Sequence, residues 1–193
     1  MRTACSQIAW GLGLMLFDFR LNNFDLLPDA LGFILILIGL ANQPVRQPAF
    51  GIAKIAAVIL LIGAIAELAG VMPVAATIAQ VNRYYSLPAL LPIGLSLLGL
   101  LALLYGICEG FERTAASIGL FDSARAFRAV WNTSLAMGAV MLFVLPFSLN
   151  GWHGLVTGIA VLAGLGQFVA GIWLVMRVSR FGREYAAARA GEM

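Results

Sequence analysis

The sequence predicts an all-α, polytopic transmembrane helical bundle of about six spans with its N- and C-termini inside. Of its 193 residues, 62% are hydrophobic and only 11% are charged, whereas soluble domains have about 45–50% and about 25%. The apolar residues form runs that are long enough to cross a bilayer, and the cationic residues gather in alternate connections. We expect one transmembrane domain over residues 1–193, because no connection exceeds about twenty residues.

Six apolar runs approach the length that a transmembrane helix needs, since a hydrocarbon core of about 30 Å requires about 20 helical residues. In chain order the predicted spans are Thr3–Phe19, Leu26–Ala41, Ile52–Val71, Leu87–Ile107, Ala129–Leu149 and Leu155–Val175. The first two are short, so a tilt, local thinning of the bilayer or a re-entrant connection could accompany them.

Local signals support the ends of these spans. The first run resembles a secretory signal, but Asp18-Phe19-Arg20 stand where a small-residue cleavage site would be, which favours an uncleaved helix. Pro28 and Asp29 are typical of a helix start, since proline loses no needed donor there and the carboxylate complements the helix dipole. Turn-forming residues separate or open the other spans: Asn42-Gln43-Pro44, Pro73, Pro88, Pro92 and Asn150-Gly151.

The distribution of cations predicts the orientation. With the N-terminus inside, the cytoplasmic side receives Arg2, Arg46, Lys54, Arg113, Arg125, Arg128, Arg177, Arg180, Arg183 and Arg189, leaving Arg20 and Arg83 outside. This bias indicates a bacterial cytoplasmic (inner) membrane with both termini in the cytoplasm. The net charge of +3 comes from these connections, so membrane lipid is the expected partner and nucleic acid is not.

Two cytoplasmic segments carry most of this charge. The stretch Glu109–Arg128 is predicted to be an amphipathic connector with a solvated face. The stretch Arg177–Met193 is alanine-rich with four arginines, which favours a helical extension of the sixth span over a segment lying on anionic headgroups.

Small residues at four-residue spacing predict close helix packing. The pattern occurs in Gly106-x-x-x-Gly110, Gly154-x-x-x-Gly158 and Ala160-x-x-x-Gly164, and it allows helix backbones to approach one another. We expect the sixth span to pack tightly against a neighbour, which could belong to the same chain, to a second copy in a homo-oligomer or to another membrane subunit. Cys5 and Cys108 are interpreted as small packing residues without metal-site spacing.

The predicted outer ends of the spans carry polar groups that could line one outward-facing acidic cleft. The candidate site residues are Asp18, Asp25, Asp29, Glu67, Arg83 and His153. The aspartates could bind a divalent cation, Asp25 and Asp29 above all, or divide acid and base roles. The plainer alternatives are a helix start at Asp29, interfacial anchors at Arg83 and His153, and a partnered or snorkelling carboxylate at Glu67.

Two resemblances concern the first hairpin. Asn22-x-x-Asp25-x-x-x-Asp29 resembles the NxxDxxxD pattern of the UbiA family of membrane prenyltransferases, which implies aspartates that bind a magnesium diphosphate. The present chain is shorter than that family, has no second DxxxD motif and is predicted to place these aspartates outside. The longer segment Asp25-Leu-Leu-Pro-Asp29-Ala-Leu-Gly32 resembles the first hairpin of small bacterial multi-pass membrane proteins with a D-x-L-P-D-x-x-G-x-x-L element, which implies membrane residence.

The sequence leaves two classes of function open. The first is a non-enzymatic membrane protein: a small transporter, a solute-binding subunit or a partner in a complex. The second is a membrane-embedded enzyme acting on a lipid or isoprenoid, with Asp25, Asp29 and Glu67 at its site. No nucleophile motif, HExxH or glycine-rich phosphate loop supports the enzyme, so it ranks second.

Overall fold

The computed structural model describes residues 1–16, 20–21, 24–25, 29–68, 87–150 and 153–190, with only the backbone described at some segment ends. In chain order the elements are α1 (Arg2–Leu16), β1 (Arg20–Leu21), β2 (Phe24–Asp25), α2 (Asp29–Ala41), α3 (Pro48–Leu68), α4 (Leu87–Ser117), α5 (Phe121–Val144), η2 (Leu145–Asn150) and α6 (His153–Ala190). The two short strands form an antiparallel pair that joins α1 to α2. The predicted helical bundle is therefore confirmed.

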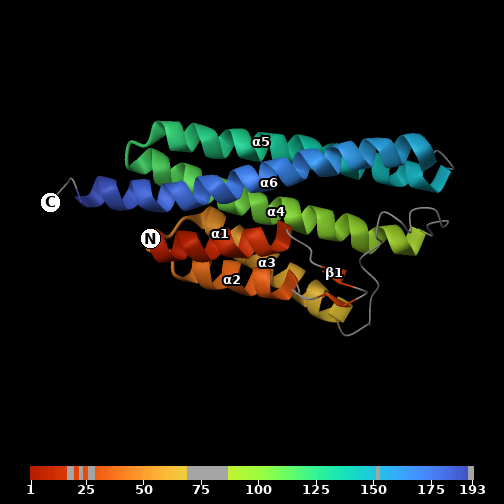
Figure 1. The fold of residues 1–193 in the computed structure, drawn as a ribbon, viewed down its shortest axis with the longest axis horizontal. Helices are drawn as coiled ribbons and strands as arrows, with labels where there is room; N and C mark the ends of the chain where they lie inside the picture. Colours follow the sequence, from red (N-terminus) through yellow and green to blue (C-terminus); the bar gives the residue numbers. More distant parts are fainter. Residues whose placement is uncertain (17–19, 22–23, 26–28, 69–86, 151–152, 191–193) are drawn as a thin grey trace.

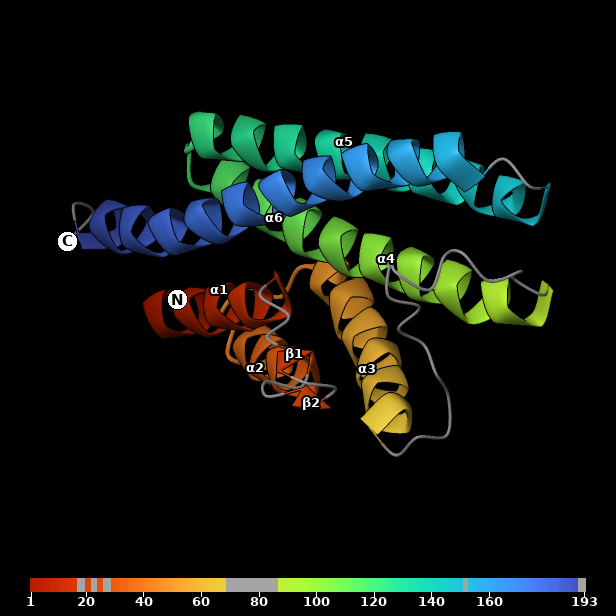
Figure 2. The same ribbon diagram turned by 45° about the vertical axis from the view of Figure 1, so that its right-hand side comes forward.

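Each helix packs against the next one along the chain, and α6 returns to pack against α1. The long helices α4, α5 and α6 form one layer, and the shorter α1, α2 and α3 form a second layer against it (Figures 1 and 2). The start of α1 and the end of α6 lie at the same end of the bundle (Figure 1). We call this the charged end, because most of the described charged side chains lie there, and we call the other one the opposite end.

Four helical segments are long and apolar enough to cross a membrane: Pro48–Ala66, Leu90–Ser117, Phe121–Phe147 and Gly154–Ala188. The first two predicted spans are shorter than expected, because α1 has 15 residues and α2 has 13. At 1.5 Å per residue these helices are about 22 Å and about 20 Å long, against a hydrocarbon core of about 30 Å. By length, four helices can each cross the hydrocarbon core, whereas α1 and α2 are too short to cross it at full thickness.

The most tightly packed core lies toward the charged end. Phe111 of α4 is fully buried and contacts three other rings, with centroid distances of 5.3 Å to Phe50, 5.3 Å to Phe127 and 5.5 Å to Phe181. These rings come from α3, α5 and α6, so a single aromatic cluster joins four helices. Edge-to-face and stacked rings gain attraction beyond simple burial.

Close backbone contacts replace large side chains where α3 meets α4. A Cβ added at Gly106 would lie 2.5 Å from the backbone nitrogen of Ala53 and 2.6 Å from the carbonyl oxygen of Ala49, and one added at Gly110 would enter the Phe50 ring. The predicted close packing at Gly106-x-x-x-Gly110 is therefore confirmed, and the neighbour belongs to the same chain. Only glycine allows this approach.

The corresponding prediction for α6 is wrong within the chain. A Cβ added at Gly154, Gly158 or Gly164 would meet nothing within 4 Å. The helix instead packs through Gly166 against Met137 of α5 and through Gly171 against Leu16 of α1. The spacing of the small residues is the same in both cases, but the two pairs of α6 lie on different faces of that helix and neither meets another helix at its own level. Gly171 follows Gly164 on one of these faces and contacts Leu16, the residue at which α1 ends.

The charged segments are helical rather than loops. The expected connector Glu109–Arg128 divides into the end of α4 and the start of α5, separated only by residues 118–120. Gly119 has a φ of 76°, the left-handed conformation that glycine adopts readily at helix ends. At the C-terminus, the predicted helical extension is confirmed, because α6 continues to Ala190.

Candidate functional site

The predicted acidic cleft falls mainly on residues or side chains that the structure does not describe. Asp18 and Arg83 lie outside the described residues. Asp25 is placed by its backbone in β2, opposite Arg20 in β1. Glu67 lies in the last turn of α3 and His153 begins α6, and their side chains are likewise outside the description.

Asp29 is the candidate whose side chain is described. It is half-buried and begins α2, the position that the helix dipole favours for a carboxylate. Its predicted role as a helix start is therefore confirmed, and a cation site shared with Asp25 stays a prediction. Among the described residues, no group of three His, Cys, Asp or Glu side chains could hold a metal ion.

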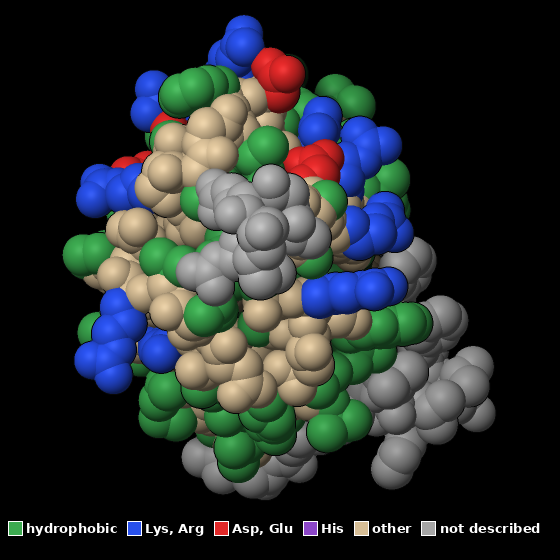
Figure 3. All heavy atoms as spheres, turned by 90° about the vertical axis from the view of Figure 1, so that its left-hand side faces the viewer, with side chains coloured by type: hydrophobic (Ala, Val, Ile, Leu, Met, Phe, Trp, Pro, Cys, Tyr) green, Lys and Arg blue, Asp and Glu red, His purple; other side chains and the backbone are tan. Residues whose placement is uncertain are grey.

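The described part of the chain concentrates its charge at the charged end (Figure 3). Here α1, α3 and α5 begin and α2, α4 and α6 end. The charged side chains described there are Arg2, Arg46, Lys54, Glu109, Glu112, Arg113, Asp122, Arg125, Arg128, Arg177, Arg180, Arg183 and Glu184. Cations outnumber carboxylates in this set, so the end is basic as a whole.

On α4 and α5 the arginines are neutralised locally. Arg113 Nε donates to Glu109 Oε1 at 2.6 Å, and Arg125 pairs with Asp122 at 2.8 Å. Arg128 of α5 pairs with Glu112 of α4 and so links the two helices. These groups fit the predicted solvated face of mixed charge and leave little excess potential on this side.

Three arginines earlier in α6 lack such partners among the described residues. Arg177, Arg180 and Arg183 form no ion pair with any described residue. The nearest carboxylate in sequence, Glu184, accepts a hydrogen bond from the Ser123 hydroxyl at 2.6 Å instead. Three guanidinium groups therefore share one segment of helix without a counter-ion in the part of the chain that the structure describes.

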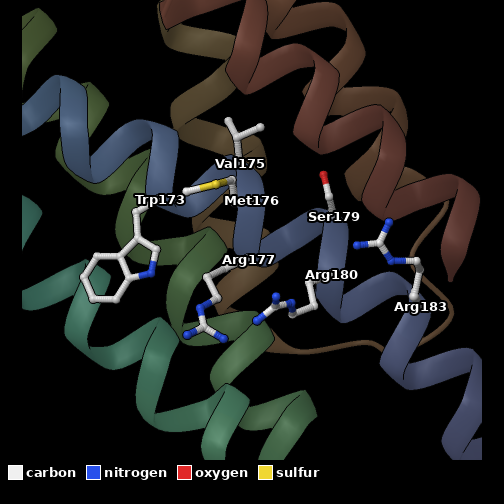
Figure 4. Close-up of a pocket in the computed structure, with 7 residues that line it drawn as sticks. All are labelled: Trp173, Val175, Met176, Arg177, Ser179, Arg180 and Arg183. Atoms are coloured by element: carbon white, nitrogen blue, oxygen red, sulfur yellow. The ribbon is translucent and has the colours of Figure 1, made fainter.

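These arginines line a surface pocket of about 480 Å³ together with Trp173, Val175, Met176 and Ser179. We call it the basic pocket. In Figure 4 the side chains of Arg177 and Arg180 lie on the same side of α6, whereas Val175 and Ser179 point the other way. Guanidinium groups present several fixed N–H donors, which match phosphate and carboxylate oxygens.

A second hollow of about 460 Å³ adjoins the first between α1 and α6. Its lining is mostly apolar: Ser6, Ala9, Trp10, Gly13 and Leu14 from α1, with Val175 and Ser179 from α6. We call it the apolar groove. Val175 and Ser179 belong to both linings, so the two hollows adjoin on the side of α6 that carries these residues, with Arg177 and Arg180 on the other side.

Contacts between α1 and α6 fix the direction of this groove. Gly171 lies against Leu16, and Gly182 lies against Cys5 and the backbone of Arg2. The helices are therefore antiparallel, with Ser6 and Ser179 nearer the charged end and Leu14 and Val175 deeper in the bundle. The groove leads from the level of the arginines into the apolar part of the helices.

Comparison with protein-family models, curated proteins and solved structures finds no match. The basic helical extension at the end of α6 was predicted from the sequence, but its pocket was not. A usable signal was present: Arg177, Arg180 and Arg183 recur every three residues directly after an apolar run. The contribution of α1 had no such signal, because it depends on which face of α1 meets α6.

Proposed function

We propose that this chain is a six-span integral membrane protein of a bacterial cytoplasmic membrane, with both termini in the cytoplasm. Four long apolar helices support membrane residence. The basic charged end, which holds the start of α1 and the end of α6, supports the orientation. The short helices α1 and α2 would cross with help from their connecting hairpin and from local thinning of the bilayer.

Within this topology the protein acts as a non-enzymatic binding subunit that holds an anionic group at its cytoplasmic end. The observation that carries this proposal is the contrast between the two arginine sets. Those of α4 and α5 are neutralised by Glu109, Glu112 and Asp122. In contrast, Arg177, Arg180 and Arg183 of α6 line a pocket without a described counter-ion. An anionic ligand would supply the missing charge.

Thermal unfolding of the detergent-purified protein tests this function. A ligand that binds the folded state raises the transition temperature in proportion to the logarithm of its concentration over its Kd. We expect anionic ligands to stabilise the wild-type chain and to do so less in the variant Arg177→Gln/Arg180→Gln/Arg183→Gln. The panel contains inorganic phosphate, anionic and zwitterionic lipids, and an acidic peptide.

Arg125→Gln is the matched control, because it also removes a cation at the charged end. Arg125 and Asp122 are 79% and 96% exposed, so breaking their pair should cost little stability. Equal ligand responses in the triple variant and the wild type would exclude the basic pocket as the binding site.

The acidic cleft at the opposite end is a separate proposal for solute or divalent-cation binding. Its support is the sequence clustering of Asp18, Asp25 and Asp29, together with the start of α2 at Asp29. If these residues share a site with Glu67, single Asn or Gln replacements should each remove stabilisation by a divalent cation while leaving the protein folded. Independent behaviour of the variants would contradict a shared site.

A further inference from the structure

We infer that the basic pocket and the apolar groove together hold one anionic phospholipid, with its phosphate at the arginines of α6 and an acyl chain along α1. This inference rests on the proposed binding function and names its ligand. Neither hollow requires a phospholipid by itself. Two features favour a phospholipid: the basic pocket and the apolar groove adjoin, and the groove leads away from the charged end.

The two linings have the chemistry of the two parts of a lipid. On the side of α6 that carries Ser179, the basic pocket supplies the Arg183 guanidinium and the Ser179 hydroxyl, both donors to phosphate oxygens, while Arg177 and Arg180 add positive charge around the helix. The apolar groove supplies mainly Ala9, Trp10, Leu14 and Val175, which offer no charge. Val175 and Ser179 stand at the junction, where a glycerol backbone would join phosphate to chain.

The groove also has the direction and length that an acyl chain needs. From Ser6 to Leu14 it follows eight helical steps, or about 12 Å. One leaflet of hydrocarbon is about 15 Å deep, half of the bilayer core. The groove begins beside the charged end and leads away from it, so a chain anchored at the arginines would enter the membrane interior.

Lipid accounts for the whole surface better than a soluble anion or an acidic peptide does. Free phosphate would satisfy the arginines but leave the groove unused. Trp10 is 68% exposed on the wall of the groove, and exposed tryptophan is typical of the boundary between headgroups and hydrocarbon. An acidic peptide from the cytoplasm could reach the arginines but would have to enter the hydrocarbon to fill the groove.

Gly13 provides a direct test of the groove. A Cβ added there would meet nothing within 4 Å, so a larger side chain fits the fold while filling the space that a lipid chain would occupy. Gly63 on α3 is equally open and lies far from the pocket in sequence and structure. Gly13→Leu and Gly63→Leu are therefore a matched pair with the same chemical change.

The experiment measures the apparent Kd from thermal unfolding against lipid concentration in detergent, at fixed low salt. The probes are dioleoylphosphatidylglycerol and dioleoylphosphatidylcholine, which have the same chains and differ in headgroup charge, with inorganic phosphate as the soluble anion. We expect stabilisation by the anionic lipid only. The variant Arg177→Gln/Arg180→Gln/Arg183→Gln should weaken its binding on the order of a hundred-fold, about five-fold per cation.

Gly13→Leu should weaken anionic-lipid binding about ten-fold, equivalent to the lost burial of roughly two methylene groups, and Gly63→Leu should leave it unchanged. If Gly13→Leu binds like the wild type, or if inorganic phosphate stabilises as strongly as the anionic lipid, the lipid inference is overturned while the binding function stands. If the arginine variant also binds normally, both proposals fail.

Discussion

Phe111 illustrates how single side chains hold the charged end together. Its ring contacts Phe50, Phe127 and Phe181, which belong to three other helices. We expect Phe111→Ala to lower the unfolding free energy by about 3–5 kcal/mol, because a cavity would open where four helices meet. Thermal unfolding in detergent measures this, with Phe143→Ala as the control.

Phe143 is 71% exposed, so its removal should leave the transition temperature nearly unchanged. If Phe111→Ala and Phe143→Ala lower the unfolding free energy equally, the aromatic cluster contributes no more to stability than an exposed ring does.

Gly106 and Gly158 allow a second test at the scale of one residue. A methyl group at Gly106 would meet the backbone of Ala49 and Ala53, which cannot move aside cheaply, whereas one at Gly158 would meet open space. Gly106→Ala should therefore destabilise the protein by about 1–3 kcal/mol. Gly158→Ala should have no such effect in the monomer.

Differential scanning of both variants in the same detergent gives the comparison. A large loss in Gly158→Ala would reveal a partner on that face of α6, either a second copy, as in the predicted homo-oligomer, or another membrane subunit.

At the scale of elements, contacts with α5 and buried aromatic rings hold the end of α6 in place. Ser123 of α5 donates a hydrogen bond to Glu184, and Tyr185 is buried beside Phe181. A hydrogen bond to a charged group contributes about 1.5–3 kcal/mol. Ser123→Ala should therefore increase local opening of α6 near Glu184.

Hydrogen exchange with mass spectrometry measures that opening in peptides covering residues 178–188. Peptides from the α3–α4 contact around Gly106 serve as the internal reference and should keep their exchange rates. If the Glu184 region exchanges equally in wild type and variant, the hydrogen bond does not hold the helix end.

The order of the elements could be predicted from the sequence, but their ends could not. Apolar runs indicated all six helices, because lipid as a solvent demands such runs. The expected connector Glu109–Arg128 is helical except at residues 118–120. Its charged residues pair within α4 and within α5, and Arg128–Glu112 links the two helices. Hydropathy shows where the apolar part of a helix lies, but it does not show how far the helix continues beyond the membrane.

At the scale of the whole molecule, the shared end of α1 and α6 predicts the membrane topology. Reporter fusions at the N- and C-termini should both report the cytoplasm, using a fluorescent protein that folds there and a phosphatase active only outside. The reason is the excess of cations at this end, which resist translocation.

A fusion placed after Leu68, at the end of α3, should give the opposite signal. Termini on different sides would contradict the proposed orientation.

The sequence by itself determined the helical class, the order of the helices and the side on which the cations gather, because these follow from composition and from charge along one dimension. It also placed the close contact at Gly106. Only the tertiary structure decided that Gly158 faces outward and that α1 supplies the groove beside Arg180. Those features depend on the rotation of each helix about its axis, and in a helix that is apolar on all sides the sequence pattern does not fix that rotation.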